Sequence, residues 1–73
     1  MTKANKFETR GRVVDTVKNR FYVELTEYAG AEPVLARLGG RIRKNNIRIV
    51  VGDDVTVELD AADLTKGRIT YRW

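Results

Sequence analysis

Apolar and polar side chains alternate in several short segments of the chain. Between residues 55 and 59 the apolar positions are Val55, Val57 and Leu59, with Thr56 and Glu58 between them. Alternation with a period of two is typical of a strand that buries one face. Similar patterns, or short apolar runs, recur elsewhere in the chain. The expected strands cover residues 7–17, 21–25, 34–38, 55–59 and 68–73.

Glycine, asparagine and clustered polar residues separate the expected strands. Lys18-Asn19 predicts a tight turn, because asparagine tolerates a positive φ angle, and Gly52-Asp53 predicts another. Gly11 lies inside the first expected strand and indicates a bulge or a sharp bend there. Residues 60–66 are polar and predict a loop, whereas residues 41–46 have the moderate helix propensity of a single helical turn.

Five short strands, with one helical turn between the third and the fourth, predict a small closed or partly open barrel. An SH3-like barrel has the same number of strands, but the helical turn after the third strand favours the OB arrangement. We therefore expect an all-β, five-stranded OB-fold barrel over residues 7–73, preceded by a flexible basic arm over residues 1–6. The chain of 73 residues leaves no room for a second domain. The core candidates among the larger side chains are Phe7, Phe21, Ile69 and Tyr71.

The charges are sorted along the chain. The formal net charge is +4, from 14 basic and 10 acidic residues, and by itself this could serve solubility alone. Residues 37–48, however, contain several basic side chains and no acid, whereas residues 53–63 contain several acids and no base. This segregation predicts a protein that offers one face to a polyanion.

The residue inventory argues against an enzyme. Histidine and cysteine are absent, so neither a Ser-His nor a Cys-His nucleophile can be assembled, and no phosphate-binding loop is present. The acids of residues 53–63 do not have the spacing of a calcium loop. We therefore expect no catalysis, no metal and no cofactor. No apolar run could span a bilayer and no secretory signal is visible, so we expect a cytoplasmic protein without membrane contact.

The basic segment has the chemistry of an RNA-binding surface. Arginine grips phosphate oxygens through a planar fork, lysine acts as a point charge, and asparagine meets ribose hydroxyls or base edges. Barrel closure would bring the last strand to the same area. Tyr22 points away from Phe21 and Val23 and is a candidate stacking platform for a base, although cross-strand packing is the more common role of an aromatic residue on a strand. The candidate RNA-binding residues are Arg41, Arg43, Lys44, Asn45, Asn46, Arg48, Arg68, Arg72 and Tyr22.

Several segments resemble the bacterial translation initiation factor 1 family. The similarity is strongest over residues 40–49 and continues through residues 52–53, 55–59 and 63–69. The resemblance implies a non-enzymatic factor that binds the decoding (A) site of the small ribosomal subunit and cooperates with the other initiation factors. A closed small barrel is expected to be a monomer. It also implies contacts to ribosomal RNA; whether a ribosomal protein takes part stays open. By this resemblance, the main contacts are Arg43, Lys44 and Arg48, assisted by Arg41, Arg68 and Arg72.

Two other functions stay open from the residues themselves. The first is a general single-stranded nucleic-acid-binding OB module of the cold-shock or S1-like kind, which would bind any unstructured oligonucleotide with comparable affinity. The second is a protein-interaction adaptor that uses the acidic residues 53–63 against a basic partner. Its binding would survive replacement of Arg43 and Lys44.

Overall fold

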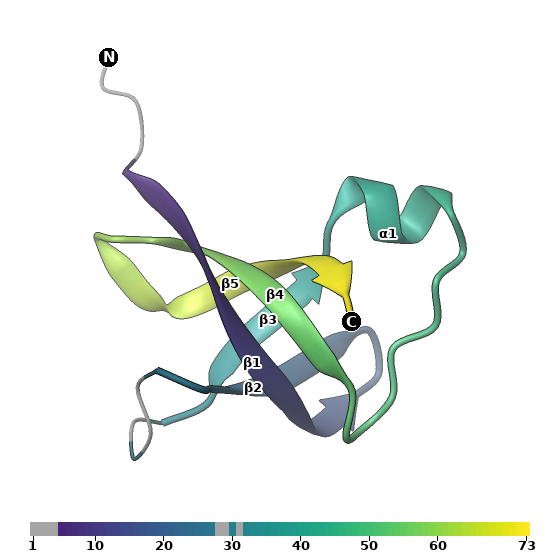
Figure 1. Cartoon of the computed structure of the whole chain (residues 1–73), viewed down its shortest axis with the longest axis horizontal. Helices are drawn as coiled ribbons and strands as arrows, with labels where there is room; N and C mark the ends of the chain where they lie inside the picture. The colour runs from purple at the N-terminus through teal and green to yellow at the C-terminus, as the bar shows by residue number, and fades with distance from the viewer. Residues whose placement is uncertain (1–4, 28–29, 31) are drawn as a thin grey trace.

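The computed structural model describes residues 5–27, 30 and 32–73. Five strands close into a barrel, and one short helix lies between the third and the fourth (Figure 1). The elements are β1 (Lys6–Val17), β2 (Arg20–Leu25), β3 (Val34–Leu38), α1 (Gly40–Lys44), β4 (Asp54–Asp60) and β5 (Asp63–Arg72). The predicted fold class, an OB-fold barrel with a helical turn after the third strand, is confirmed. Of the expected basic arm, residues 1–4 lie outside the described residues, and Lys6 already belongs to β1.

The strands are arranged in the closed order β1-β2-β3-β5-β4. The long strand β1 pairs antiparallel with β2 along one edge and with β4 along the other, so it connects the two ends of the strand order. The one parallel pair among the described strands, β3 with β5, closes the barrel and brings the end of β3 beside the end of the chain. The helix α1 follows β3 directly and therefore lies at the same end of the barrel as the end of β5 (Figure 1).

The alternating apolar side chains fill the interior of the barrel. Val55, Val57 and Leu59 on β4 are all buried, as the alternation predicted. Ile42 on α1 is also buried, at 2% exposure, and it packs in the same cluster as the strand residues. Burial of this one side chain fixes the helix against the barrel, because an isolated helix this short would not be stable in water. The described part of the chain contains no helix long and apolar enough to cross a membrane.

The core predictions hold for three aromatic and aliphatic residues and fail for one. Phe21 and Ile69 are buried, and Phe7 is half-buried against the core. Tyr71 is exposed at 52%, so its assignment to the core was wrong. The reason is an irregularity in the β4–β5 pairing: Val57 pairs with Ile69, but the next residue, Thr56, pairs with Tyr71. The extra residue on β5 turns the tyrosine to the outer face.

Local features of β1 also differ from the sequence predictions. Gly11 pairs regularly with both neighbouring strands, and the bulge lies further on, between Val13 and Asp15. Glycine is needed at this position because β1 and β2 approach each other closely here: a Cβ atom would lie 2.5 Å from Cγ1 of Val23. The turn at Lys18-Asn19 is confirmed, but Lys18 adopts the positive φ angle, 55°, rather than Asn19.

The predicted loop over residues 60–66 is much shorter in the structure. Strand β4 extends to Asp60 and β5 begins at Asp63, so only residues 61–62 form the turn. Side-chain hydrogen bonds stabilise this turn, because Asp60 Oδ1 accepts from the Ala62 amide at 2.9 Å. The polar composition that predicted a long loop therefore belongs to a tight hairpin with exposed strand ends.

The end of α1 has a Schellman geometry. The Asn46 amide donates to the Arg43 carbonyl at 3.2 Å, and the Ile47 amide donates to the Ile42 carbonyl at 3.1 Å. Asn46 takes the left-handed conformation that this motif requires, with φ 54°. Since asparagine tolerates that conformation better than most residues, the backbone by itself gives a structural reason for asparagine at this position.

Candidate nucleic-acid interface

A concave surface at the α1 end of the barrel gathers basic side chains. The hollow, which we call the basic concavity, has a volume of about 820 Å³. Lysine and arginine supply five of the residues around it, and no carboxylate is among them. The lining residues are Val17, Lys18, Asn19, Arg20, Arg37, Leu38, Gly40, Arg43 and Arg68.

Four separate elements and one turn bring these cations together. Lys18 comes from the tight turn between β1 and β2, Arg20 is the first residue of β2, and Arg43 comes from α1. Arg37 on β3 and Arg68 on β5 are partners in the parallel pairing of the two strands, so their guanidinium groups belong to neighbouring outer positions. The topology of the barrel, rather than the basic segment 37–48 alone, builds this surface.

The cations of the basic concavity have no carboxylate partners in the described residues. The single ion pair in this part of the chain joins Arg12 to Asp54, 3.3 Å apart, on β1 and β4. Charges of one sign that line a hollow produce a focused positive potential, which attracts a polyanion and not a small neutral ligand. Arginine in particular can bind phosphate oxygens in two-point fashion.

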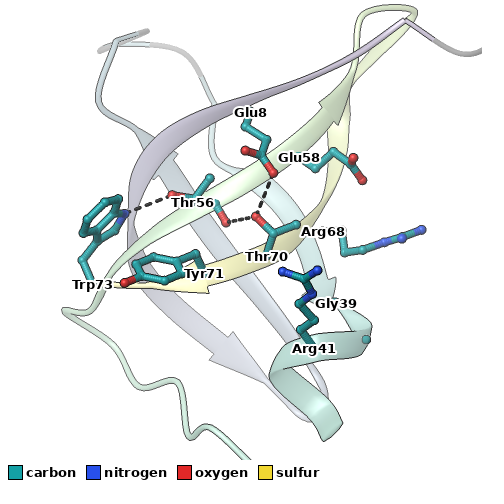
Figure 2. Close-up of a pocket in the computed structure, with 10 residues that line it drawn as sticks. Glu8, Gly39, Arg41, Thr56, Glu58, Arg68, Thr70, Tyr71 and Trp73 are labelled. Atoms are coloured by element: carbon teal, nitrogen blue, oxygen red, sulfur yellow. Dashed lines mark hydrogen bonds between the residues drawn. The ribbon is translucent and has the colours of Figure 1, made fainter. Parts of the chain in front are cut away.

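A second hollow, the aromatic cleft, adjoins the basic concavity (Figure 2). Its volume is about 520 Å³, and it shares Gly40 and Arg68 with the basic concavity. Aromatic, basic, acidic and hydroxyl side chains all contribute to it. The lining residues are Glu8, Gly39, Gly40, Arg41, Thr56, Glu58, Arg68, Thr70, Tyr71 and Trp73.

Three of the nine predicted site residues line these hollows. Arg43 lines the basic concavity, Arg41 lines the aromatic cleft, and Arg68 lines both. The exposed residues Lys44, Asn45 and Asn46, at the end of α1 and just after it, line neither hollow, and their role in RNA binding stays a prediction.

The other three predicted residues are also outside both hollows. Arg72 and Arg48 lie together, because Nη1 of Arg72 is 3.4 Å from the Arg48 carbonyl oxygen. Tyr22 is half-buried on β2, where it pairs across the strands with Leu35. This position fits the cross-strand packing alternative, and a stacking role for Tyr22 remains untested.

Several lining residues were not among the sequence candidates. Lys18 and Arg20 were missed because they are far from the basic segment in the sequence. Arg37 was missed although it begins that segment, and only the closed topology brings all three beside Arg43. A signal was present in the turn, where two basic residues flank an asparagine, a composition suited to an exposed and charged loop. Tyr71 was missed because the strand alternation placed it in the core.

The acidic residues 53–63 mostly stabilise turns. Asp53 Oδ2 accepts a hydrogen bond from the Val50 amide at 3.0 Å. Hydrogen bonds from the hydroxyl and the amide of Thr65 hold the pKa of Asp63 below its ordinary value, and the nearby charge of Lys66 adds to this effect. Among the described residues, no group of three or more possible metal ligands comes together.

The fold and the two hollows define a small OB-fold protein with a cationic surface, a type that commonly binds nucleic acid. The family model described as translation initiation factor 1A / IF-1 matches residues 1–73 of the chain. The chain belongs to this family of translation initiation factors, and the resemblance seen in its sequence is confirmed.

Solved structures of other proteins share the fold. Translation initiation factor 1 from the Wolbachia endosymbiont strain TRS of Brugia malayi is 32% identical over 93% of this chain and 78% of its own, with a TM-score of 0.74. YjeQ from Thermotoga maritima is 34% identical, with a TM-score of 0.72, over 92% of this chain. YloQ, a circularly permuted GTPase, is 21% identical with a TM-score of 0.76 and shows the fold alone. The chain spans 23% of the length of each of these last two proteins.

Proposed function

We propose that this initiation factor binds the decoding (A) site of the small ribosomal subunit, with the basic concavity against ribosomal RNA. The observation that carries the proposal is a hollow with five basic residues and no acid, at one end of a barrel of the initiation factor 1A / IF-1 family. Folded RNA presents closely spaced phosphates in a fixed arrangement, which cations from four different elements can match simultaneously.

The mechanism we propose is occupancy without a chemical reaction. The factor acts in the cytoplasm as a monomer, covers the site that an elongator transfer RNA would enter, and works beside the other initiation factors. Arg37, Arg43 and Arg68 bind phosphate oxygens in the concavity, and Lys18 and Arg20 extend the contact along the β1–β2 turn. Lys44, Arg48 and Arg72 complete the footprint on the adjoining surface.

Cosedimentation with purified small subunits over a range of salt concentrations tests the proposal. The double variant Arg37→Ala/Arg43→Ala removes two cations of the concavity. We expect weaker binding, and a slope of log affinity against log salt that is smaller by about 0.7–0.9 for each phosphate that is no longer neutralised. The matched control is Lys6→Ala/Lys66→Ala, which removes the same charge from exposed residues outside both hollows. Equal loss of binding in both double variants would show that net charge, and not this surface, governs the interaction.

A second function, general binding of single-stranded nucleic acid, is favoured by the exposed pair Tyr71 and Trp73. Their rings are 4.7 Å apart between centroids, with an angle of 68° between the ring planes, so each ring is a separate stacking platform for a base. Unstructured oligonucleotides of mixed sequence distinguish the two functions. A general module would bind them about as tightly as it binds the small subunit, whereas a decoding-site factor would prefer the subunit.

A further inference from the structure

The aromatic cleft contains chemistry that phosphate binding does not require. Three residues form a row across the outer face of three strands: Glu8 on β1 pairs with Glu58 on β4, which pairs with Arg68 on β5. Like charges directly opposite one another destabilise a sheet. In the described part of the chain, neither carboxylate forms an ion pair. Both carboxylates therefore have acceptor capacity for a ligand that donates hydrogen bonds.

The carboxylate of Glu8 points towards the centre of the cleft. The Thr70 hydroxyl lies 3.3 Å from Glu8 Oε2 and 3.4 Å from the Thr56 carbonyl oxygen, so it is a hydrogen-bond partner of the Glu8 carboxylate (Figure 2). Because Thr70 is the extra residue in the β4–β5 pairing, both it and Tyr71 face outwards. The irregularity in β5 therefore places an aromatic ring in the same cleft as a hydrogen-bond acceptor.

The aromatic wall of the cleft is held in place although it is exposed. The Trp73 indole donates from Nε1 to Thr56 Oγ1 at 3.0 Å, and its backbone amide donates to the Asp54 carbonyl at 2.7 Å. The Arg10 guanidinium lies 4.3 Å from the centroid of the tryptophan ring. Tyr71 and Trp73 remain 52% and 63% exposed. A rigid and accessible aromatic surface favours stacking, because little side-chain freedom is lost on binding.

We propose that the aromatic cleft binds one unpaired guanine base of an RNA strand, stacked on Tyr71 and read by Glu8. Guanine presents two neighbouring donors, N1–H and the N2 amino group, which match the two oxygens of a carboxylate. Adenine and cytosine present a ring-nitrogen acceptor on the corresponding edge, and this acceptor would face the carboxylate unfavourably. The volume of about 520 Å³ lies within the range of about 300–1,000 Å³ for small-ligand sites.

The charges of the cleft distinguish this ligand from a basic peptide side chain. A carboxylate and an aromatic ring would also suit an arginine of a protein partner. Arg41 and Arg68, however, line the same cleft and offset the negative charge of Glu8 and Glu58, so a cation gains little net attraction, whereas the two guanidinium groups can bind the phosphate attached to a base. Because Arg68 also lines the basic concavity, one strand of RNA can place its base in the cleft and its backbone in the concavity. The inference rests on the proposed function for its source of RNA.

Fluorescence of Trp73, the single tryptophan of the chain, reports on the cleft directly. We expect GMP to change this fluorescence with an affinity at least about tenfold above those of AMP, CMP and UMP, since charge-assisted hydrogen bonds are among the stronger ones. The variant Glu8→Gln should lower the GMP affinity by about tenfold. The matched control Glu24→Gln removes an exposed carboxylate on β2, outside both hollows, and should leave it unchanged.

Three results would overturn the inference: equal affinity for the four mononucleotides, no effect of Glu8→Gln on GMP binding, or tighter binding of N-acetylarginine amide than of GMP. Thermal melts of both glutamate variants show whether each is folded, and Glu8→Gln should melt no lower than the wild type because a like-charge pair is removed.

Cosedimentation with small subunits separates the two proposals. If subunits bind but GMP does not, the base site is wrong and the proposed function stands. If GMP binds but subunits do not, the proposed function is wrong.

Discussion

Replacement of Gly39 by alanine tests the close approach that joins β3 to β5 and positions α1. The Gly39 amide donates to the Ile69 carbonyl oxygen at 2.8 Å. A Cβ atom at residue 39 would lie 2.7 Å from that same oxygen and 3.3 Å from Cγ and Cδ of Arg68. The backbone angles of Gly39, φ −73° and ψ 169°, are ordinary for any residue. The penalty therefore comes from steric overlap and not from backbone strain.

The size of the effect follows from the nature of the atom that the methyl group meets. A carbonyl oxygen in a strand pair cannot rotate away, so β3 and β5 must separate at this point. Overpacking of this kind costs about 1–3 kcal/mol. For a domain of this size each kcal/mol corresponds to about 4–8 °C in melting temperature, so we expect Gly39→Ala to lower it by roughly 5–20 °C. Displacement of Arg68 should also weaken binding at both hollows.

The adjacent glycine provides a matched control for the same assay. A Cβ atom at Gly40 would have no other atom within 4 Å. Alanine favours helices over glycine by up to about 1 kcal/mol, so Gly40→Ala, in the first turn of α1, should leave the melting temperature unchanged or raise it. Thermal unfolding followed by circular dichroism measures both variants. Equal melting temperatures for Gly39→Ala and Gly40→Ala would refute the reasoning.

Three further predictions concern stability and ionisation. Thr9→Val should raise the urea midpoint by an amount that corresponds to about 1 kcal/mol, because the Thr9 hydroxyl is buried without a partner among the described residues; a lower midpoint would contradict this. Asn46→Val should destabilise the protein by about 1–2 kcal/mol in urea unfolding, since φ is positive there, whereas Asn46→Gly should be tolerated. Thr65→Val should raise the pKa of Asp63 towards its ordinary value in an NMR titration. Because the pKa of Asp63 is lower in the folded than in the unfolded state, the ionised carboxylate stabilises the wild type at pH values above the unfolded-state pKa. This stabilisation is lost as the pH falls through the folded-state pKa.

The regular parts of the barrel could be predicted from the sequence because their side chains obey the two-residue period. Residues 55–59 alternate without exception, and their alternation corresponds to the inward and outward faces of β4. The helical turn was also predictable, since its boundaries are set by local residues such as Gly39 before it and Asn46 after it. These features depend on residues that are close to one another in the sequence. A sequence pattern contains this local information.

The candidate site was only partly predictable because it depends on long-range pairing. The sequence identified Arg41, Arg43 and Arg68, which belong to the basic segment and the last strand. It did not identify Arg37, whose position beside Arg68 follows from the parallel register of β3 and β5. Nor did it place Tyr71 outside the barrel, because one inserted residue reverses the faces of a strand and no local signal marked the insertion.

The irregularity in β5 connects the fold to the proposed base site. With regular pairing, Tyr71 would share the inward face of Ile69 and enter a barrel interior that is already filled by Val55, Val57 and Leu59. The extra residue avoids this overlap, and it places Thr70 and Tyr71 on the same outer face as Glu8. Deletion of Thr70 should therefore separate the two properties. It would leave Tyr71 directly after Ile69 and opposite Thr56 in a regular pairing, so the ring would stay on the outer face, whereas the hydroxyl beside Glu8 would be lost.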